Sequence, residues 1–178
     1  HITNEIQEWL ERVAAQCTDE SEETPDVCII ELGGTVGDIE SAPFVEALRQ
    51  FQFRVGRENM CLFHVSLVPV IGVVGEQKTK PTQHTVKELR GAGLTPDFLV
   101  CRSSEPLLPE VKEKLSSFCH VEPSQVFSAH DVPNIYHVAL MLNEQGASEK
   151  LSERLGLKIP ASRPLLDDWR GMAERVDN

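Results

Sequence analysis

The chain has 178 residues, enough for one domain with a hydrophobic core, and 28 acidic against 17 lysine and arginine side chains give it a formal net charge of −11. This acidic balance argues against a nucleic-acid-binding surface. The most apolar stretch, residues 60–75, contains His64, Ser66 and Pro69 and is too short to span a bilayer, so the sequence also argues against a membrane protein.

The first third of the chain begins with the pattern of an amphipathic helix. In residues 1–16, apolar side chains recur at helical spacing along one face. Residues 17–25 are acidic without periodicity, which predicts a solvated loop. The continuous apolar run at residues 26–32 predicts a buried strand of a parallel sheet, leading into a glycine-rich loop. Pro43 suits the first turn of a helix predicted at residues 43–53.

The middle of the chain predicts a strand, a long loop and a helix. Residues 60–68 are mostly apolar and predict the strand, in which His64 is either a satisfied core side chain or a ligand residue. The loop, residues 70–81, has a length that is often functional in compact domains. Thr82 is the expected N-cap of a helix that runs through Leu89.

The rest of the chain continues the alternation of strands and helices. We expect strands at residues 97–101 and 125–129, and helices at residues 109–118, 134–144, 147–155 and 165–176. This alternation predicts an α/β fold with a parallel, doubly wound sheet covered on both faces. The last helices are expected to form a tail that packs over one edge of the sheet or mediates association. Without a repeat, low-complexity segment or linker, residues 1–178 are predicted to form one domain.

The cysteines and histidines show no metal-binding pattern. No two cysteines have CxxC spacing, and Cys28, Cys61 and Cys101 lie in apolar runs, which predicts buried free thiols. Free thiols are typical of a reducing compartment, so we expect a cytoplasmic protein. The histidines lack the spacing of zinc ligands.

Two long motifs carry a resemblance to a known family. Residues 31–41, Glu-Leu-Gly-Gly-Thr-Val-Gly-Asp-Ile-Glu-Ser, follow a predicted strand, where open α/β sheets bind ligands and where glycines let the backbone approach a ligand closely. This run resembles the signature of the amidoligase (synthetase) domain of CTP synthases. Residues 75–84, Gly-Glu-Gln-Lys-Thr-Lys-Pro-Thr-Gln-His, resemble that family's second signature, at the family's spacing. The resemblance covers nearly the whole chain and implies a sheet of the P-loop amidoligase, dethiobiotin synthetase-like type.

The resemblance also implies a reaction, the ATP- and Mg²⁺-dependent amination of UTP. In the family, ATP phosphorylates the C4 oxygen of UTP, and ammonia then displaces the phosphate to give CTP. Phosphoryl transfer relies mainly on positioning and on stabilisation by cations. We therefore expect ATP as a co-substrate, Mg²⁺ as a cofactor, and UTP and CTP as ligands.

The acidic residues of the first motif have two implied roles. Glu31 matches a glutamate that helps to bind Mg²⁺ at the reacting phosphate, and a carboxylate suits this hard cation. Asp38, Ile39 and Glu40 match a turn that contacts the pyrimidine of UTP or CTP, where a carboxylate can accept from an exocyclic amine. The alternatives are that Glu31 caps a backbone amide, and that Asp38 and Glu40 stabilise the next helix through its dipole.

The second motif opens a locally basic stretch in an acidic chain. Such a stretch can attract a triphosphate without general affinity for polyanions. The resemblance implies that two lysines are catalytic, Lys78 and Lys80. It also implies a UTP/CTP site formed by Lys78, Thr79, Lys80, Pro81, Thr82, Gln83 and Lys114. The alternative for each of these lysines is a solvated side chain.

A third segment is implied to contact ATP. It comprises His130, Asp131 and Val132, which align with an ATP-contacting segment of the family and follow the strand predicted at residues 125–129. Backbone contacts are the main expectation here.

Two parts of the family's enzyme have no counterpart in this sequence. There is no GxxxxGK[ST] phosphate loop and no glutaminase domain with a Cys-His-Glu triad to supply ammonia. Because the chain also starts at His1, we expect it to be the C-terminal part of an amidoligase domain, inactive alone. The implied partners are a glutaminase domain of the same protein and further copies in a homotetramer.

Two other functions stay open at the sequence level. The chain could be a non-catalytic module for UTP/CTP regulation or tetramer assembly. It could also come from a relative of dethiobiotin synthetase, which the turn Asp38-Ile39-Glu40 disfavours.

Overall fold

The fold is built on a parallel sheet with the strand order β1-β4-β5. The computed structural model describes residues 1–18, 23–158 and 164–177. The paired strands are β1 (Phe63–Leu67), β4 (Phe98–Ser103) and β5 (Val126–His130). Each of these strands lies close to a predicted one, and all run in the same direction.

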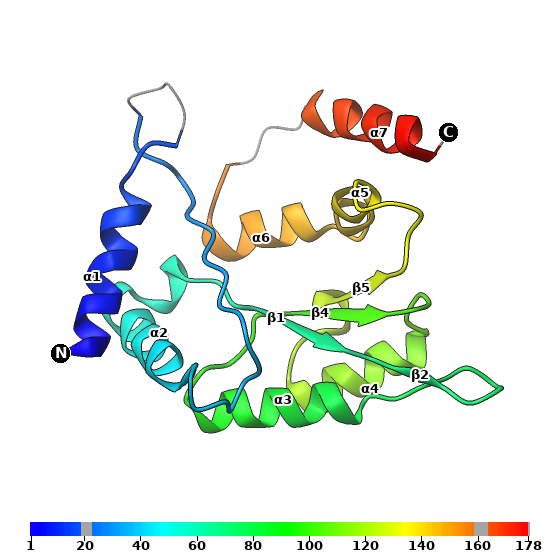
Figure 1. Ribbon diagram of the computed structural model, residues 1–178, viewed down its shortest axis with the longest axis horizontal. Helices are drawn as coiled ribbons and strands as arrows, with labels where there is room; N and C mark the ends of the chain where they lie inside the picture. Colours follow the sequence, from blue (N-terminus) through cyan, green and yellow to red (C-terminus); the bar gives the residue numbers. More distant parts are fainter. Residues whose placement is uncertain (19–22, 159–163, 178) are drawn as a thin grey trace.

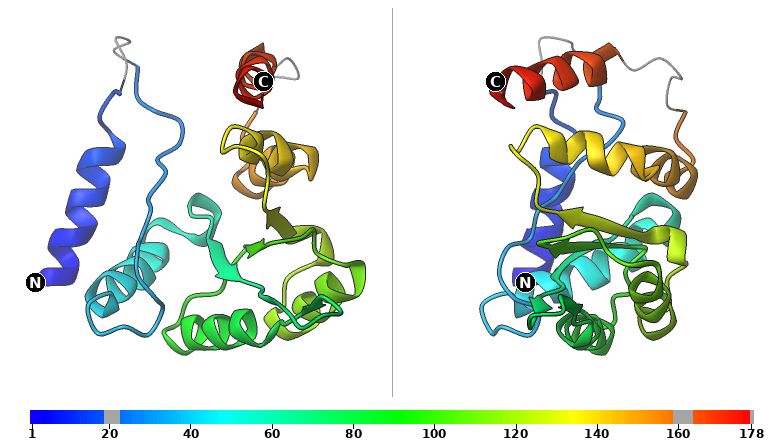
Figure 2. Two further views of the ribbon diagram at one scale, coloured as in Figure 1. Left: turned by 45° about the vertical axis from the view of Figure 1, so that its right-hand side comes forward. Right: turned by 90° about the vertical axis from the view of Figure 1, so that its right-hand side faces the viewer.

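Helices cover both faces of this sheet (Figure 1, Figure 2). On one face lie α3 (Lys80–Gly91) and α4 (Pro109–Cys119), and on the other lie α5 (His137–Glu144) and α6 (Ala147–Leu155), with α7 (Pro164–Asp177) beyond them. The predicted doubly wound α/β class is therefore confirmed. Further elements are α1 (Ile2–Ala14), α2 (Ala42–Val55), β2 (Val70–Ile71), β3 (Glu76–Gln77) and the 3-10 helices η1 (Arg57–Asn59) and η2 (Pro123–Gln125).

Both faces of the sheet are apolar, which is why its strands are near-continuous apolar runs in the sequence. Toward α3 and α4, Val86, Leu99 and Leu115 are at most 1% exposed. Burying a side chain of this size contributes roughly 1.5–3 kcal/mol. On the opposite face, the rings of Phe98 and Phe127 lie 5.7 Å apart between centroids.

Residues 26–32 form no strand, contrary to the prediction from their apolar run. They pass α1 and α2 without regular structure, and Ile29 is 91% exposed. An apolar run becomes a strand only where a neighbour satisfies its backbone groups, and among the described residues β1 pairs only with β4. Cys28 is therefore exposed, whereas Cys61 is partly buried and Cys101 is fully buried as predicted.

The loop predicted at residues 70–81 contains the antiparallel hairpin β2–β3. The helix that follows begins at Lys80, two residues before the predicted cap. Pro81 is tolerated in this first turn because its missing N–H would have no helical partner there. Thr82 is fully buried, and its hydroxyl bonds to β1 instead of capping the helix.

Polar side chains tie the C-terminal helices to the rest of the fold. Arg154 of α6 donates from Nε to Asp97 Oδ1 at 2.7 Å, and the two side chains are only 21% and 9% exposed. The same guanidinium donates to the carbonyl of Arg57, before β1. Trp169 of α7 donates from Nε1 to the carbonyl of Tyr136, just before α5. None of the described helices is long and apolar enough to cross a membrane.

The outer edge of β5 is covered by a side-chain amide. Gln145, at the end of α5, donates from Nε2 to the carbonyl of Ser128 and accepts at Oε1 from the N–H of Ser128, both at 2.8 Å. One glutamine thus replaces the pair of bonds that a neighbouring strand would make.

Candidate functional site

The carboxyl ends of β1, β4 and β5 meet at one edge of the sheet, where open α/β sheets bind ligands. The hairpin β2–β3 and the loop before α4 border this edge (Figure 1). Gln77, which is 8% exposed, donates to the carbonyl of Pro106 at 2.8 Å and accepts from the N–H of Leu108 at 3.0 Å. Its amide therefore holds the hairpin against the loop, next to Lys78.

A groove of about 740 Å³ runs along α3, beside α4. Its lining residues are Lys80, Gln83, His84, Lys87, Arg90, Gly91 and Phe118. Lys80, Lys87 and Arg90 are spaced seven and three residues apart, so they share one side of the helix. Lys114 precedes Phe118 by four residues and lies on the same side of α4.

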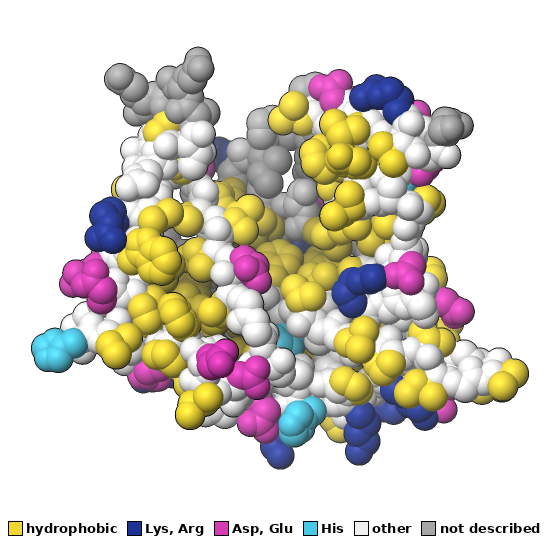
Figure 3. Space-filling model, viewed as in Figure 1, with side chains coloured by type: hydrophobic (Ala, Val, Ile, Leu, Met, Phe, Trp, Pro, Cys, Tyr) yellow, Lys and Arg dark blue, Asp and Glu magenta, His cyan; other side chains and the backbone are white. Residues whose placement is uncertain are grey.

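This groove is a positively charged surface on an acidic protein. No aspartate or glutamate is among its described lining residues. Among the residues that the structure describes, no carboxylate lies within ion-pair distance of Lys80, Lys87 or Arg90. Lysine and arginine side chains gather along the lower edge of the molecule, over α3 (Figure 3). Such a local concentration of cations attracts anionic ligands.

The two lysines of the second motif have different surroundings. The Lys78 ammonium lies 2.6 Å from Glu76 Oε2 of the same hairpin, and its side chain is 40% exposed. The Lys80 side chain lines the groove at the start of α3. Only Lys80 is therefore both exposed and without a carboxylate partner among the described residues.

The threonines of the second motif turn inward. Thr79 and Thr82 are 4% and 0% exposed. Thr79 Oγ1 accepts from Gln83 Nε2 at 2.9 Å, and Thr82 Oγ1 donates to the carbonyl of Leu67 at 3.2 Å. Of the expected UTP/CTP residues in this motif, the structure thus brings Lys80 and Gln83 to the groove and hides both hydroxyls.

The expected pyrimidine turn lies on the loop before α2. Asp38 Oδ2 accepts from the N–H of Thr35 at 3.3 Å, while Ile39 is 88% exposed. Val36 of this loop packs against an apolar cluster that contains Val45 and Leu48 of α2 and Leu89, near the end of α3. Lys80 starts that helix, so Lys80 and the cluster residue Leu89 lie toward opposite ends of α3, about 13 Å apart along its axis.

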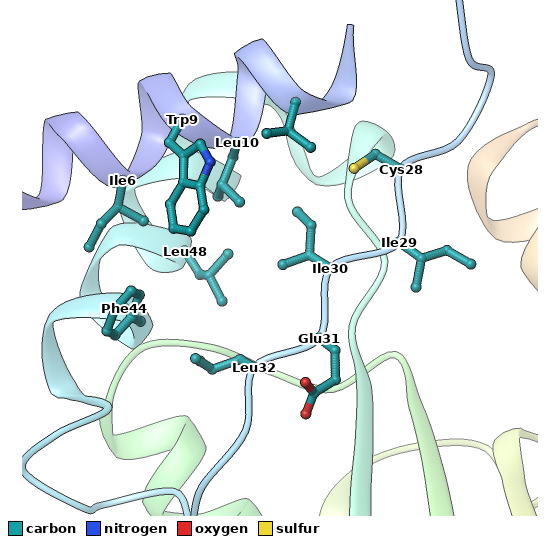
Figure 4. Close-up of a pocket in the computed structure, with 11 residues that line it drawn as sticks. Ile6, Trp9, Leu10, Cys28, Ile29, Ile30, Glu31, Leu32, Phe44 and Leu48 are labelled. Atoms are coloured by element: carbon teal, nitrogen blue, oxygen red, sulfur yellow. The ribbon is translucent and has the colours of Figure 1, made fainter. Parts of the chain in front are cut away.

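Glu31 is exposed at the rim of an apolar pocket of about 300 Å³ between α1, α2 and residues 28–32. Its carboxylate points away from the apolar side chains of the pocket (Figure 4). No group of three His, Cys, Asp or Glu side chains in the described chain is arranged to hold a metal ion. A single exposed carboxylate still suits Mg²⁺, which takes its other ligands from water and phosphate.

The expected ATP segment begins at the last residue of β5, and an unpredicted arginine contacts it. His130 Nδ1 lies 3.2 Å from Ser128 Oγ, and Val132 is partly buried. Asp131 Oδ1 accepts from Arg102 Nη2 at 2.7 Å. Arg102 also donates to the carbonyl of Ala129 at 2.7 Å. The signal in the sequence was a cation directly after the strand predicted at residues 97–101.

A parallel doubly wound sheet with a basic groove beside its ligand-binding edge is typical of α/β nucleotide-binding proteins as a class. Comparison with known sequences narrows this class. The family profile described as CTP synthase N-terminus matches residues 1–157. This chain therefore belongs to the CTP synthase family, as its two motifs indicated.

Named relatives match the chain over nearly its whole length. It is 57% identical to CTP synthase of Dictyostelium discoideum over 187 residues, covering 99% of this chain and 33% of the relative. It is 60% identical to CTP synthase 1-A of Xenopus laevis and 59% identical to CTP synthase 1 of Homo sapiens, covering 99% of this chain and 30% of each relative. The chain thus spans about a third of the length of these relatives.

Proposed function

We propose that the intact protein containing this chain catalyses the ATP-dependent amination of UTP to CTP, and that this chain supplies part of its nucleotide-binding surface. The observation that carries the proposal is the basic groove that starts at Lys80. The first part of the groove, formed by Lys80, Gln83 and His84, belongs to the second family motif, within a member of the CTP synthase family.

In this proposal the start of α3 holds the triphosphate of UTP, or of CTP as product. Lys80 and Gln83 face the groove, and the N–H groups of Lys80 and Thr82 lie in the first turn, where helices bind anions. Thr79 and Thr82 contribute through their backbone, because their hydroxyls are engaged inside. Pro81 fixes the geometry of the turn. Lys78 reaches a phosphate by exchanging its contact with Glu76.

The pyrimidine is assigned to the turn Asp38-Ile39-Glu40, whose Ile39 is open to contact. The hydrogen bond from the N–H of Thr35 orients the Asp38 carboxylate. Lys114, on the side of α4 that carries Phe118, would add charge beside the groove.

ATP is assigned to His130, Asp131 and Val132, with Arg102 holding the Asp131 carboxylate in place. Glu31 would hold Mg²⁺, which neutralises charge on the reacting phosphate when it is bound. The described chain adds Lys78 and Lys80 as cations for the transferring group, consistent with the electrostatic demands of phosphoryl transfer.

The source of ammonia and the assembly of the protein complete the proposal. A glutaminase domain in the remaining two thirds of the protein would supply ammonia, and four copies would form a homotetramer. Support for both comes from family membership and from the third of the relatives' length that this chain covers.

The test is steady-state CTP formation by the intact protein carrying Lys80→Ala. Because Lys80 has no carboxylate partner among the described residues, its loss removes charge from the groove without freeing a buried partner there. We expect kcat/KM for UTP to fall by about tenfold or more, equivalent to ~1.4 kcal/mol of lost transition-state stabilisation.

Arg12→Ala is the matched control, since it removes one positive charge from the exposed face of α1. It should leave kcat/KM unchanged. Equal activity of the Lys80→Ala variant and the parent protein would reject the groove as the UTP site. Absence of UTP- and ATP-dependent CTP formation by the parent protein would reject the reaction itself.

A further inference from the structure

A stripe of polar side chains lies between β1 and α3, inside an otherwise apolar layer. His64 and Ser66 alternate with outward-facing residues of β1, so both point toward α3. On the helix, Thr82 and Thr85 are three residues apart and face the strand. His64 is 8% exposed and Thr82 is completely buried.

Two hydrogen-bonded pairs join the strand to the helix. Ser66 Oγ donates to Thr82 Oγ1 at 2.9 Å, and Thr82 Oγ1 donates in turn to the carbonyl of Leu67 at 3.2 Å. One turn further along, His64 Nε2 lies 2.8 Å from Thr85 Oγ1, which also lies 3.1 Å from the carbonyl of Thr82.

The single hydroxyl proton of Thr85 limits the directions in which its two hydrogen bonds can run. A hydroxyl has one proton, and Thr85 donates its own to the carbonyl of Thr82. When Thr85 donates to this carbonyl, its oxygen accepts from the Nε2–H of His64. Burial lowers the pKa of His64, which favours the neutral ring.

The pairs determine where α3 sits along β1. Apolar contacts such as that of Val86 are non-directional and tolerate sliding, whereas hydrogen bonds need both atoms within about 3 Å and aligned. A slip of α3 by one turn would move Lys80 by about 5.4 Å and break both pairs. The same helix carries Lys80 and Gln83 into the groove on its other side.

We propose that Ser66, His64, Thr82 and Thr85 are positioning residues that hold α3 in the register at which Lys80 and Gln83 face the nucleotide groove. The inference rests on the proposed function for its kinetic readout. No contact with substrate is assigned to the hydroxyl groups of Ser66, Thr82 and Thr85 or to the imidazole of His64.

The main experiment compares Thr82→Val with Thr82→Ser in the intact protein. Valine keeps the shape of threonine and removes the hydroxyl, whereas serine keeps the hydroxyl. For Thr82→Val we expect KM for UTP to rise by about tenfold, the scale of one lost hydrogen bond, with kcat within about twofold and KM for ATP unchanged. Thr82→Ser should restore KM for UTP to within about twofold of the parent protein.

Val86→Ala is the control for general destabilisation, because it leaves a cavity in the same interface without touching the polar pairs. It should lower the melting temperature and leave KM for UTP unchanged. If Thr82→Val does not fold, Ser66→Ala removes the same bond from the strand side and should raise KM for UTP alike.

The inference is overturned if the folded valine or alanine variant keeps the parental KM for UTP. It is equally overturned if serine is as impaired as valine, or if Val86→Ala raises KM to the same extent. Hydrogen–deuterium exchange of the α3 amides distinguishes failure of the positioning inference from failure of the proposed function. Even in a protein that makes no CTP, exchange must be faster in Thr82→Val than in Val86→Ala.

Discussion

At the scale of single residues, two lysines that are two positions apart in the sequence differ in what they can do. Lys78 is neutralised by Glu76 at 2.6 Å, whereas Lys80 opens onto the groove without a carboxylate partner in the described chain. The sequence motif treats them alike. Their difference arises because Lys78 still belongs to the hairpin and Lys80 already belongs to the helix.

His64 makes the stability of the protein depend on pH. Burial lowers its pKa in the folded state below the ordinary value of 6.5, so the unfolded chain takes up a proton first as the pH falls. The contribution of neutral His64 to the free energy of unfolding is therefore complete above pH 6.5. Below that pH it is lost progressively, because protons bind the unfolded chain more readily than the folded one. We expect the melting temperature of the parent protein to fall more steeply between about pH 7 and pH 5 than that of His64→Asn.

Thermal unfolding of both proteins across this pH range is the measurement. The variant lacks the imidazole, so it supplies the background slope from all other groups. Identical slopes for the two proteins would show that His64 does not titrate differently on folding.

At the scale of elements, the ion pair between α6 and the start of the sheet is a strong link. Asp97 is 9% exposed and also accepts from the N–H of Leu62, so removing Arg154 would leave a buried carboxylate without its cation. We expect Arg154→Ala to reduce the free energy of unfolding by about 3–5 kcal/mol.

Chemical denaturation measures this loss, and Arg49→Ala is the comparison. Arg49 also binds a carboxylate at 2.7 Å, that of Glu46, but both side chains are more than 40% exposed. Its loss should leave the denaturation midpoint nearly unchanged. Equal midpoints for Arg154→Ala and the parent protein would contradict the prediction.

The elements also show what could be predicted from the sequence. Periodicity located α1, α2, α4 and α6 and the three paired strands, because local side-chain patterns determine which face is buried. It failed at residues 26–32, where the apolar pattern is present but no hydrogen-bonding neighbour lies in the described chain. Pairing is a long-range property that a local pattern does not contain.

At the scale of the whole molecule, the candidate site depends on distances that motifs do not encode. Val36 of the first motif packs against an apolar cluster that includes Leu89 of α3, and the second motif starts the same helix. Arg102 reaches Asp131 only because β4 and β5 are neighbours, although 29 residues separate the two side chains in the sequence. Residue types were therefore predictable, and their spatial arrangement required the fold.

The distribution of charge predicts a response to salt. This chain has a net charge of −11, so in the proposed function the attraction of nucleotides would come from the local cations of the groove. Raising the ionic strength from about 0.1 M to about 1 M shortens the screening length from about 10 Å to about 3 Å. We expect KM for UTP to rise by roughly fivefold over this range, as long-range attraction is lost.

Initial rates at increasing potassium chloride test this prediction in the intact protein. Lys80→Ala should respond less steeply than the parent protein, because one of the screened charges is already absent. A KM for UTP that is independent of salt would mean that the groove does not attract the nucleotide electrostatically.

The side-chain amide of Gln145 also affects how readily the β5 edge can pair with another chain. By occupying both backbone groups of Ser128, it removes the template that an open β5 edge would offer to another chain during folding or storage. A single side chain thus protects the β5 edge from pairing with a strand of another molecule at Ser128.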